Sequence, residues 1–267
     1  MKKIFVLLTL VGVSAMFATT SLAQSSWKDS NATQPKNEIW YTSKDGTIVE
    51  PTRYNSQVFS VNGINIVSNT YKDGKGVIVF DDVVKLIGGL AFQKNDNLTS
   101  ISIPEGVTQI QMMAFAGCTS LSSITIPNGV TDIGKWAFFE CTSLTNIIIP
   151  NSVVRIEEQA FYNCTSLTSI ALPYPSYTAR TSLGKGAFAN CKSLTSVYCK
   201  SLEPPTMYGD NAFEGVPSDC KLYVLTQSVE KYKNTPGWRR FYYNTVGYDF
   251  PEDYYDKATN RIRGYNN

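Results

Sequence analysis

The chain has 267 residues, with 24 lysines and arginines, 22 aspartates and glutamates, and no histidine. The lack of histidine excludes Ser-His-Asp and Cys-His nucleophiles, HExxH zinc sites and every acid–base mechanism that relies on an imidazole. The near balance of charge disfavours nucleic acid as a partner, because proteins that bind it need a surplus of positive charge to displace counterions from phosphates.

The first 23 residues have the pattern of a Sec signal peptide. Lys2 and Lys3 precede an apolar run over 4–17, and small residues lead to Ala23, after which we place cleavage. The run is shorter than the ~20 residues that span a bilayer, which disfavours the alternative of a membrane anchor. Cleavage would leave 22 basic and 22 acidic residues, since the leader holds two lysines and no acid. The pattern predicts a secreted or cell-surface protein with no later membrane span; the alternative location is the periplasm.

A repeat that begins near Gly76 governs the fold. The dipeptide Ala-Phe recurs at 91–92, 114–115, 137–138, 160–161, 187–188 and 212–213. In the same phase, a Leu-x-x-Ile-x-Ile-Pro motif places branched residues at Ile101/Ile103, Ile124/Ile126, Ile147/Ile149 and Ile170/Leu172. This alternation predicts a short strand with both branched residues pointing inward, and the proline ends it. Identical short strands at a regular spacing predict parallel stacking in a solenoid.

The residues of the repeat resemble a known family. The segment Ala-Phe-Phe-Glu-Cys-Thr-Ser-Leu-Thr-Asn-Ile-Ile-Ile-Pro-Asn-Ser-Val at 137–153 resembles the BspA-like leucine-rich repeats of secreted and surface proteins of Bacteroidetes. The flanks 38–43, 65–71 and 222–238 resemble that family's leader and cap, although Leu225 stands where the cap usually has proline. The resemblance implies an α/β-type, strand-dominated solenoid, coiled right-handed, with a parallel sheet on its concave face.

Four parts are expected along the chain. They are the signal peptide (1–23), an N-terminal leader and cap (24–75), the leucine-rich repeat solenoid (76–225), and a C-terminal cap with a tyrosine-rich tail (226–267). The repeat phase places Ile78 and Phe80 in a degenerate first coil and Leu222 in a last strand. The Asp-Gly pairs at 45–46 and 73–74 predict hairpin turns. The tail either covers the last strand or extends away from it.

The cysteines do not indicate chemistry. Cys118, Cys141, Cys164 and Cys191 share one repeat phase, but no CxxC spacing occurs and no histidine can complete a metal site. We therefore predict a column of buried free thiols and no metal. Cys199 takes an inward strand position and Cys220 precedes the last strand; a disulfide between them is the open alternative in an exported protein.

Adjacent acidic pairs do not form a catalytic carboxylate pair. On an extended strand, the side chains of Asp81 and Asp82, or of Glu157 and Glu158, would point to opposite faces. We expect no enzymatic activity and no cofactor. The resemblance implies instead a role in adhesion and protein–protein interaction.

Candidate ligand contacts lie on the concave strand face. In a leucine-rich repeat, the strand residues between the inward ones face that side, and Thr125, Ile148 and Tyr198 are such residues. Ile148 and Tyr198 offer anchors of the kind found at binding hot spots. The alternative is a plain solvated sheet face. Trp136, Phe139 and Tyr162 flank the Ala-Phe pairs, where packing between coils is expected.

A longer coil between Pro173 and Thr181 adds the second candidate site. Insertions in repeat arrays form loops, often on a working face, and this one carries Tyr174, Tyr177 and Arg180. A protein ligand is the first hypothesis. The second is a carbohydrate-binding accessory protein whose Tyr174, Tyr177 and Tyr198 stack on sugar rings, and the third is a structural element of the cell envelope.

Overall fold

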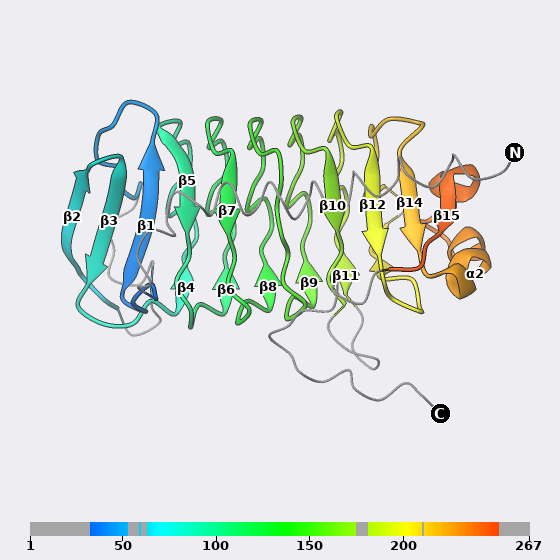
Figure 1. Ribbon diagram of the computed structural model, residues 1–267, viewed down its shortest axis with the longest axis horizontal. Coiled ribbons are helices and arrows are strands. Elements are labelled where there is room, and N and C mark those ends of the chain that lie inside the picture. The colour runs from blue at the N-terminus through cyan, green and yellow to red at the C-terminus, as the bar shows by residue number, and fades with distance from the viewer. Residues whose placement is uncertain (1–32, 53–58, 60–62, 175–180, 210, 251–267) are drawn as a thin grey trace, which may run out of the picture.

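The computed structural model describes residues 33–52, 59, 63–174, 181–209 and 211–250. They form a stack of coils in which two rows of strands run side by side along the long axis (Figure 1). The Ala-Phe turns make the third side of each coil. This is the strand-dominated repeat solenoid that the sequence predicts. The predicted signal peptide lies outside the described residues and remains a prediction.

The first row of strands carries the paired branched residues of the repeat. It consists of β5 (Leu98–Ser102), β7 (Ser123–Thr125), β10 (Ser169–Ala171), β12 (Ser196–Cys199) and β14 (Lys221–Val224). Neighbours pair in parallel, with Ile101 beside Ile124 and Ile170 beside Val197. Between β7 and β10, the described chain makes an isolated bridge from Ile148 to Ala171. The eight branched residues of the four motifs are each at most 8% exposed, which confirms that they point into the core.

A second parallel sheet of six strands lies among the described residues. It contains β4 (Leu86–Ile87), β6 (Gln109–Ile110), β8 (Asp132–Ile133), β9 (Arg155–Ile156), β11 (Ser182–Leu183) and β13 (Thr206–Met207). Each strand has two residues, one of which points inward in β6 and β9, where Ile110 and Ile156 are buried. The registers Ile110–Ile133 and Ile133–Ile156 keep these side chains in one column.

The phenylalanines of the Ala-Phe pairs form a continuous stack on the third side. Ring centroids of successive residues from Phe92 to Phe213 are 5.0–5.4 Å apart and the rings are within 10° of parallel. The backbone holds the same spacing, because the Phe115 N–H donates to the Ala137 carbonyl at 2.8 Å and the Phe138 N–H to Ala160 at 2.7 Å. All six rings are buried. Each coil therefore depends on its neighbours to cover its ring faces.

The four cysteines of the repeat phase are buried free thiols, as predicted. Each thiol donates to the carbonyl of the phenylalanine in the preceding coil, for example Cys118 to Phe92 at 2.9 Å and Cys141 to Phe115 at 3.2 Å. Burial raises the pKa of Cys118 to about 12 and that of Cys141 well above its usual range. These thiols stay protonated at neutral pH and are poor nucleophiles.

Alkylation tests this state of the cysteines. In denaturant without reductant, an alkylating reagent is expected to add six labels per chain, because all six cysteines are free in the structure. In native buffer we expect none of the six to react at an appreciable rate, since burial keeps the reactive thiolate form scarce. Intact-mass spectrometry reads both results. Two or fewer labels in denaturant would show that neighbouring thiols had bridged.

The N-terminal cap departs from the repeat phase. Strand β1 (Glu38–Ser43) lies between β3 (Lys75–Phe80) and β5 and is antiparallel to both, while β2 (Ile66–Lys72) pairs with the outer edge of β3. Ile78 and Phe80 are buried as expected, but they do not stack in parallel on β5. The first-coil assignment was wrong on this point, because alternation determines which side chains point inward and not which strand lies alongside.

The two predicted Asp-Gly turns have different outcomes. Asp73 and Gly74 have φ of 51° and 79° and connect β2 to β3, which confirms the hairpin. The turn at 45–46 follows β1, but the described residues 47–52 after it form no strand, so that turn is no hairpin.

The C-terminal cap closes the stack of phenylalanine rings and the sheet edge. Its elements are η1 (Thr226–Ser228), α2 (Val229–Asn234), η2 (Arg239–Asn244) and β15 (Thr245–Gly247). Trp238 and Phe241 are buried against Phe213, with ring centroids 5.9 and 5.3 Å from it. Strand β15 pairs in parallel with β14, which covers part of the last edge. Residues 245–247 of the tail thus cover the last strand, which was one of the two alternatives, and do not extend away from it.

Candidate functional site

The outer face of the first sheet holds the predicted concave-face residues. One row of outward residues passes from Ser102 to Thr125, and another register joins Ile148, Ala171, Tyr198 and Tyr223. Thr125 is exposed and Ile148 is 44% exposed. Both residues are accessible to a partner where the sequence placed them.

Tyr198 is not accessible in the same way. It points outward from β12 but is only 7% exposed. Its ring stacks on Tyr223 at 4.8 Å and meets Tyr248 edge-on at 6.3 Å, and Phe250 packs on the same group. The residues that follow β15 thus cover this end of the face. The alternation of the strand predicted the outward direction of Tyr198 correctly. The sequence around Tyr198 does not show that Tyr248, 50 residues later in the chain, packs over it.

The other end of the face is also covered. Trp40 of β1 lies opposite Ser102 and is 8% exposed. The Ser102 hydroxyl and the Gln34 side-chain oxygen are 2.7 Å apart in a hydrogen bond, and the Gln34 amide donates to the Ser102 carbonyl at 3.0 Å. Between the two covered ends lies an open stretch that we call the central face. It consists of Ser123, Thr125, Asn146, Ile148, Ser169 and Ala171.

The central face carries no charged side chain. Its members are short hydroxyl, amide and methyl side chains, with one larger apolar side chain at Ile148. None of these side chains ionises, so they can lose water at low electrostatic cost when a partner approaches. Short side chains also let a partner backbone approach the sheet closely. Such a surface suits contact with another macromolecule and offers no acid, base or nucleophile pair.

The two described ends of the inserted loop, Tyr174 and Thr181, lie between β10 and β11 along the chain. Tyr174 is half-buried and its backbone N–H donates to the Asn151 side-chain oxygen at 3.0 Å. The buried Thr181 hydroxyl donates to the Pro173 carbonyl at 2.9 Å, which ties the two ends of the loop together. Tyr177 and Arg180 lie outside the described residues, so their part in a site remains a prediction.

Cys199 and Cys220 do not form the disulfide that was the open alternative. Both are free, and Cys199 lies beside Val224 in the register of β12 and β14. Cys220 precedes β14 and is four residues from Val224, which at ~3.3 Å per residue places it roughly 13 Å along the strand. A disulfide requires Cα atoms within about 7 Å. Instead, the Tyr232 hydroxyl and the Cys199 sulfur are in hydrogen-bond contact at 3.0 Å.

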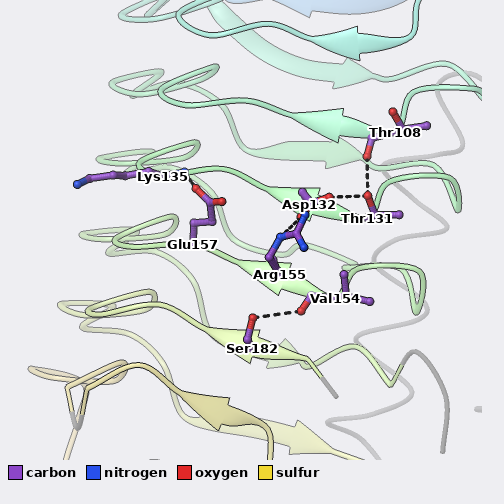
Figure 2. Close-up of polar contacts among 8 residues, drawn as sticks. All are labelled: Thr108, Thr131, Asp132, Lys135, Val154, Arg155, Glu157 and Ser182. Atoms are coloured by element: carbon purple, nitrogen blue, oxygen red, sulfur yellow. Dashed lines mark hydrogen bonds and ion pairs between the residues drawn. The ribbon is translucent and has the colours of Figure 1, made fainter. Parts of the chain in front are cut away.

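Charged residues on the second sheet pair with each other across the coils (Figure 2). Asp132 of β8 forms an ion pair with Arg155 of β9 and accepts a hydrogen bond from Thr131 at 2.6 Å. Between the same two coils, the Glu157 carboxylate accepts a hydrogen bond from the Lys135 backbone N–H at 3.0 Å. Because Asp132 is 9% exposed and its carboxylate already has partners, this cluster fixes the register of the coils and leaves little free for a ligand.

Two negative findings concern the described part of the chain. No group of three or more Asp, Glu or Cys side chains there is arranged to hold a metal ion. No helix in the same ranges has the length and apolar character needed to cross a membrane.

The predicted packing of the aromatic residues beside the Ala-Phe pairs is confirmed. The rings of Phe139 and Tyr162 stack at 5.1 Å, and the Trp136 indole N–H donates to the Gln159 side-chain oxygen at 2.6 Å. These contacts join the third coil to the fourth.

Three solved structures are similar to parts of this chain. A leucine-rich repeat protein of T. pallidum is 35% identical, over 44% of this chain and 53% of its own, with a TM-score of 0.41. The pneumococcal vaccine antigen PcpA is 21% identical over 61% and 38%, with a TM-score of 0.48. A leucine-rich cell surface protein of Faecalibacterium prausnitzii is 22% identical over 76% and 54%, with a TM-score of 0.40. This chain therefore spans at most 54% of each of these relatives.

No curated protein gives a significant match. The model of the BspA-type leucine-rich repeat region matches residues 85–218 in six copies. That range contains all six Ala-Phe turns and the strands of both rows from β4 to β13. The chain belongs to the BspA-type leucine-rich repeat family.

Proposed function

We propose that the protein is an exported, non-enzymatic binding module that holds a protein partner on its central face, at the cell surface or in the medium. The family supports an interaction role, and the leader-like residues 1–23 support export. The observation that carries the proposal is the central face itself: an open, uncharged patch with covered sheet at both ends and an exposed Ile148 in it.

Ile148 is the expected anchor. Most repeat-motif isoleucines are buried, but this one projects outward and remains 44% exposed. Burial of such a side chain in a partner contributes roughly 1.5–3 kcal/mol. The small hydroxyl and amide groups around it resemble the ring of weak contacts that keeps water away from a hot spot.

A protein ligand fits this face better than a glycan does. Sugar recognition uses exposed aromatic rings, and the first-sheet tyrosine proposed for that role, Tyr198, is covered by Tyr223 and Tyr248. The glycan hypothesis on Tyr174 and Tyr177 stays a proposal that depends on the inserted loop.

The double variant Thr125→Lys/Ile148→Lys is expected to weaken partner binding by about 2 kcal/mol or more, roughly 30-fold in Kd, because two charges would have to be desolvated at the anchor. The full mature chain is tested by biosensor against a panel of immobilised purified extracellular proteins. Val67→Lys, a 65% exposed apolar position on β2 far along the sheet, is the matched control and should bind as the wild type does.

The inserted loop is tested in the same assay. The variant Tyr174→Ala/Tyr177→Ala/Arg180→Ala should melt at nearly the wild-type temperature and lose a similar amount of affinity if the loop is part of the site. If every partner found binds the central-face variant as tightly as the wild type, the central face is not the site.

A further inference from the structure

The Ala-Phe side of the solenoid contains a cavity of about 340 Å³, away from the central face. Its floor is Ala116 and Gly117 of the second turn, and its walls include Met113, Trp136 and Phe139. This volume is at the lower end of the range for small-molecule sites, about 300–1,000 Å³.

The cavity lies where the small Ala116 stands between two larger side chains of one column. The residue after the phenylalanine of the Ala-Phe pair is Gln93, Ala116, Phe139 and Tyr162 in the first four turns, followed by Ala189 and Glu214 in the last two. Phe139 stacks on Tyr162 through one ring face. On the other side, one coil away, the column offers only the methyl group of Ala116. The second ring face of Phe139 therefore borders the cavity instead of another ring.

Two contacts hold the side chain of Trp136, which lines the cavity, in position. Its indole N–H donates to Gln159 at 2.6 Å, and the Lys135 ammonium lies 4.2 Å from the centroid of its ring. The backbone at Trp136 has a φ of +57°, the left-handed conformation that this position of the turn also has at Met113 (57°) and Gln159 (53°).

The rim of the cavity is polar and balanced in charge. Lys94 can donate, Glu140 can accept, and both line the opening. Gln159 also lines it, and because its side-chain oxygen is engaged by Trp136, its NH₂ group is the part left to donate. An aromatic side chain of a partner would pack against the apolar lining but would leave these three polar side chains without hydrogen bonds. A neutral sugar ring would contact the apolar lining with its C–H face and would form hydrogen bonds to the polar side chains with its hydroxyls.

We propose that this cavity binds a neutral sugar ring of a glycan. The ring stacks its C–H face on Phe139, in the place that an aromatic side chain at Ala116 would fill, and its hydroxyls bond to Lys94 and Glu140. The site is separate from the central face, so the protein would hold a protein partner and a glycan on different sides of one solenoid.

The test is a titration of the full mature chain with neutral hexasaccharides built from glucose, mannose, galactose or xylose, by isothermal calorimetry and saturation-transfer NMR. At least one of them should bind the wild type. Ala116→Phe, which fills the cavity and completes the stack, should weaken that binding at least tenfold. Thr125→Lys/Ile148→Lys should leave it unchanged, which separates this site from the one proposed on the first sheet.

Three results would overturn the proposal: no hexasaccharide binds at 10 mM, as an order of magnitude for weak sugar sites; binding survives in Ala116→Phe; or N-acetyl-tryptophanamide binds there and no sugar does. If Ala116→Phe fails to fold by circular dichroism, Glu140→Ala replaces it, because it changes only an exposed rim side chain and should also weaken binding.

Discussion

Replacement of Phe138 by alanine is expected to lower the free energy of unfolding by about 3–5 kcal/mol. Phe138 is fully buried, and its ring lies between Phe115 at 5.2 Å and Phe161 at 5.0 Å. Truncation leaves a void that the neighbouring rings cannot fill, since the backbone of each coil is bonded to the next through the Phe115–Ala137 and Phe138–Ala160 hydrogen bonds. The cost is large because the void separates two coils, and a solenoid is stable only through contacts between neighbours.

Urea denaturation followed by circular dichroism measures this loss. Phe139→Ala is the matched control: its ring lies on the surface side of the same turn, is half-buried, and stacks on Tyr162 alone. We expect the control to lose about 1 kcal/mol, of the order of one aromatic pair. A loss near 1 kcal/mol for Phe138→Ala as well would mean that the coils close up around the void.

The core could be predicted from the sequence because its signals are local and repeated. Each Ile-x-Ile pair sets its own inward direction, and the fixed spacing of the Ala-Phe pairs places the rings in one column. Because the same pattern recurs in several coils, only one arrangement, a parallel stack, places every repeat in the same environment. The buried thiols follow for the same reason, since Cys118 and its three equivalents hold one position in four successive turns.

The ends of the sheet could not be predicted in this way. Strand β1 enters between β3 and β5 from a segment outside the repeat, and Tyr248 and Phe250 cover Tyr198 from the far end of the chain. Such contacts depend on which distant segment packs against the edge or face of a strand. The residues of the strand itself do not determine which segment this is. The sequence therefore predicts that Thr125, Ile148 and Tyr198 point outward, but it does not predict that Tyr198 is covered.

The cavity at Ala116 was missed for a different reason. The residues beside the Ala-Phe pairs were interpreted one coil at a time, and Phe139 and Trp136 do pack between coils. The signal lies in a comparison down the column, where Ala116 and Gly117 are small beside Gln93 and Phe139. Beside Phe139, the small side chain of Ala116 leaves room for a hollow, because the backbone fixes the spacing of the coils.

Gly184→Ala is the second substitution for which we expect a large loss of stability, about 3 kcal/mol or more, at or above the usual upper range for an overpacked core. Gly184 follows β11, and a Cβ there would lie 2.4 Å from the Glu158 nitrogen and 2.5 Å from the Glu157 carbonyl carbon. These are backbone atoms. They cannot rotate away, since the Glu157 N–H donates to Ile133 at 2.9 Å and the Glu158 carbonyl accepts from Trp136 at 3.0 Å.

The cost arises from coil spacing and not from an unusual backbone angle. The sheet register places Gly184 beside Glu157 and Gly134 beside Gln111, and a Cβ at Gly134 would also lie 2.8 Å from the Gln111 backbone. Glycine in one coil therefore lets the chain approach its predecessor closely. Gly89→Ala is the control, because the nearest atom to its Cβ would be the Met112 carbonyl oxygen at 3.3 Å; we expect a loss below about 1 kcal/mol. Equal losses for the two variants in urea denaturation would show that β11 moves away from β9 without breaking the ladder.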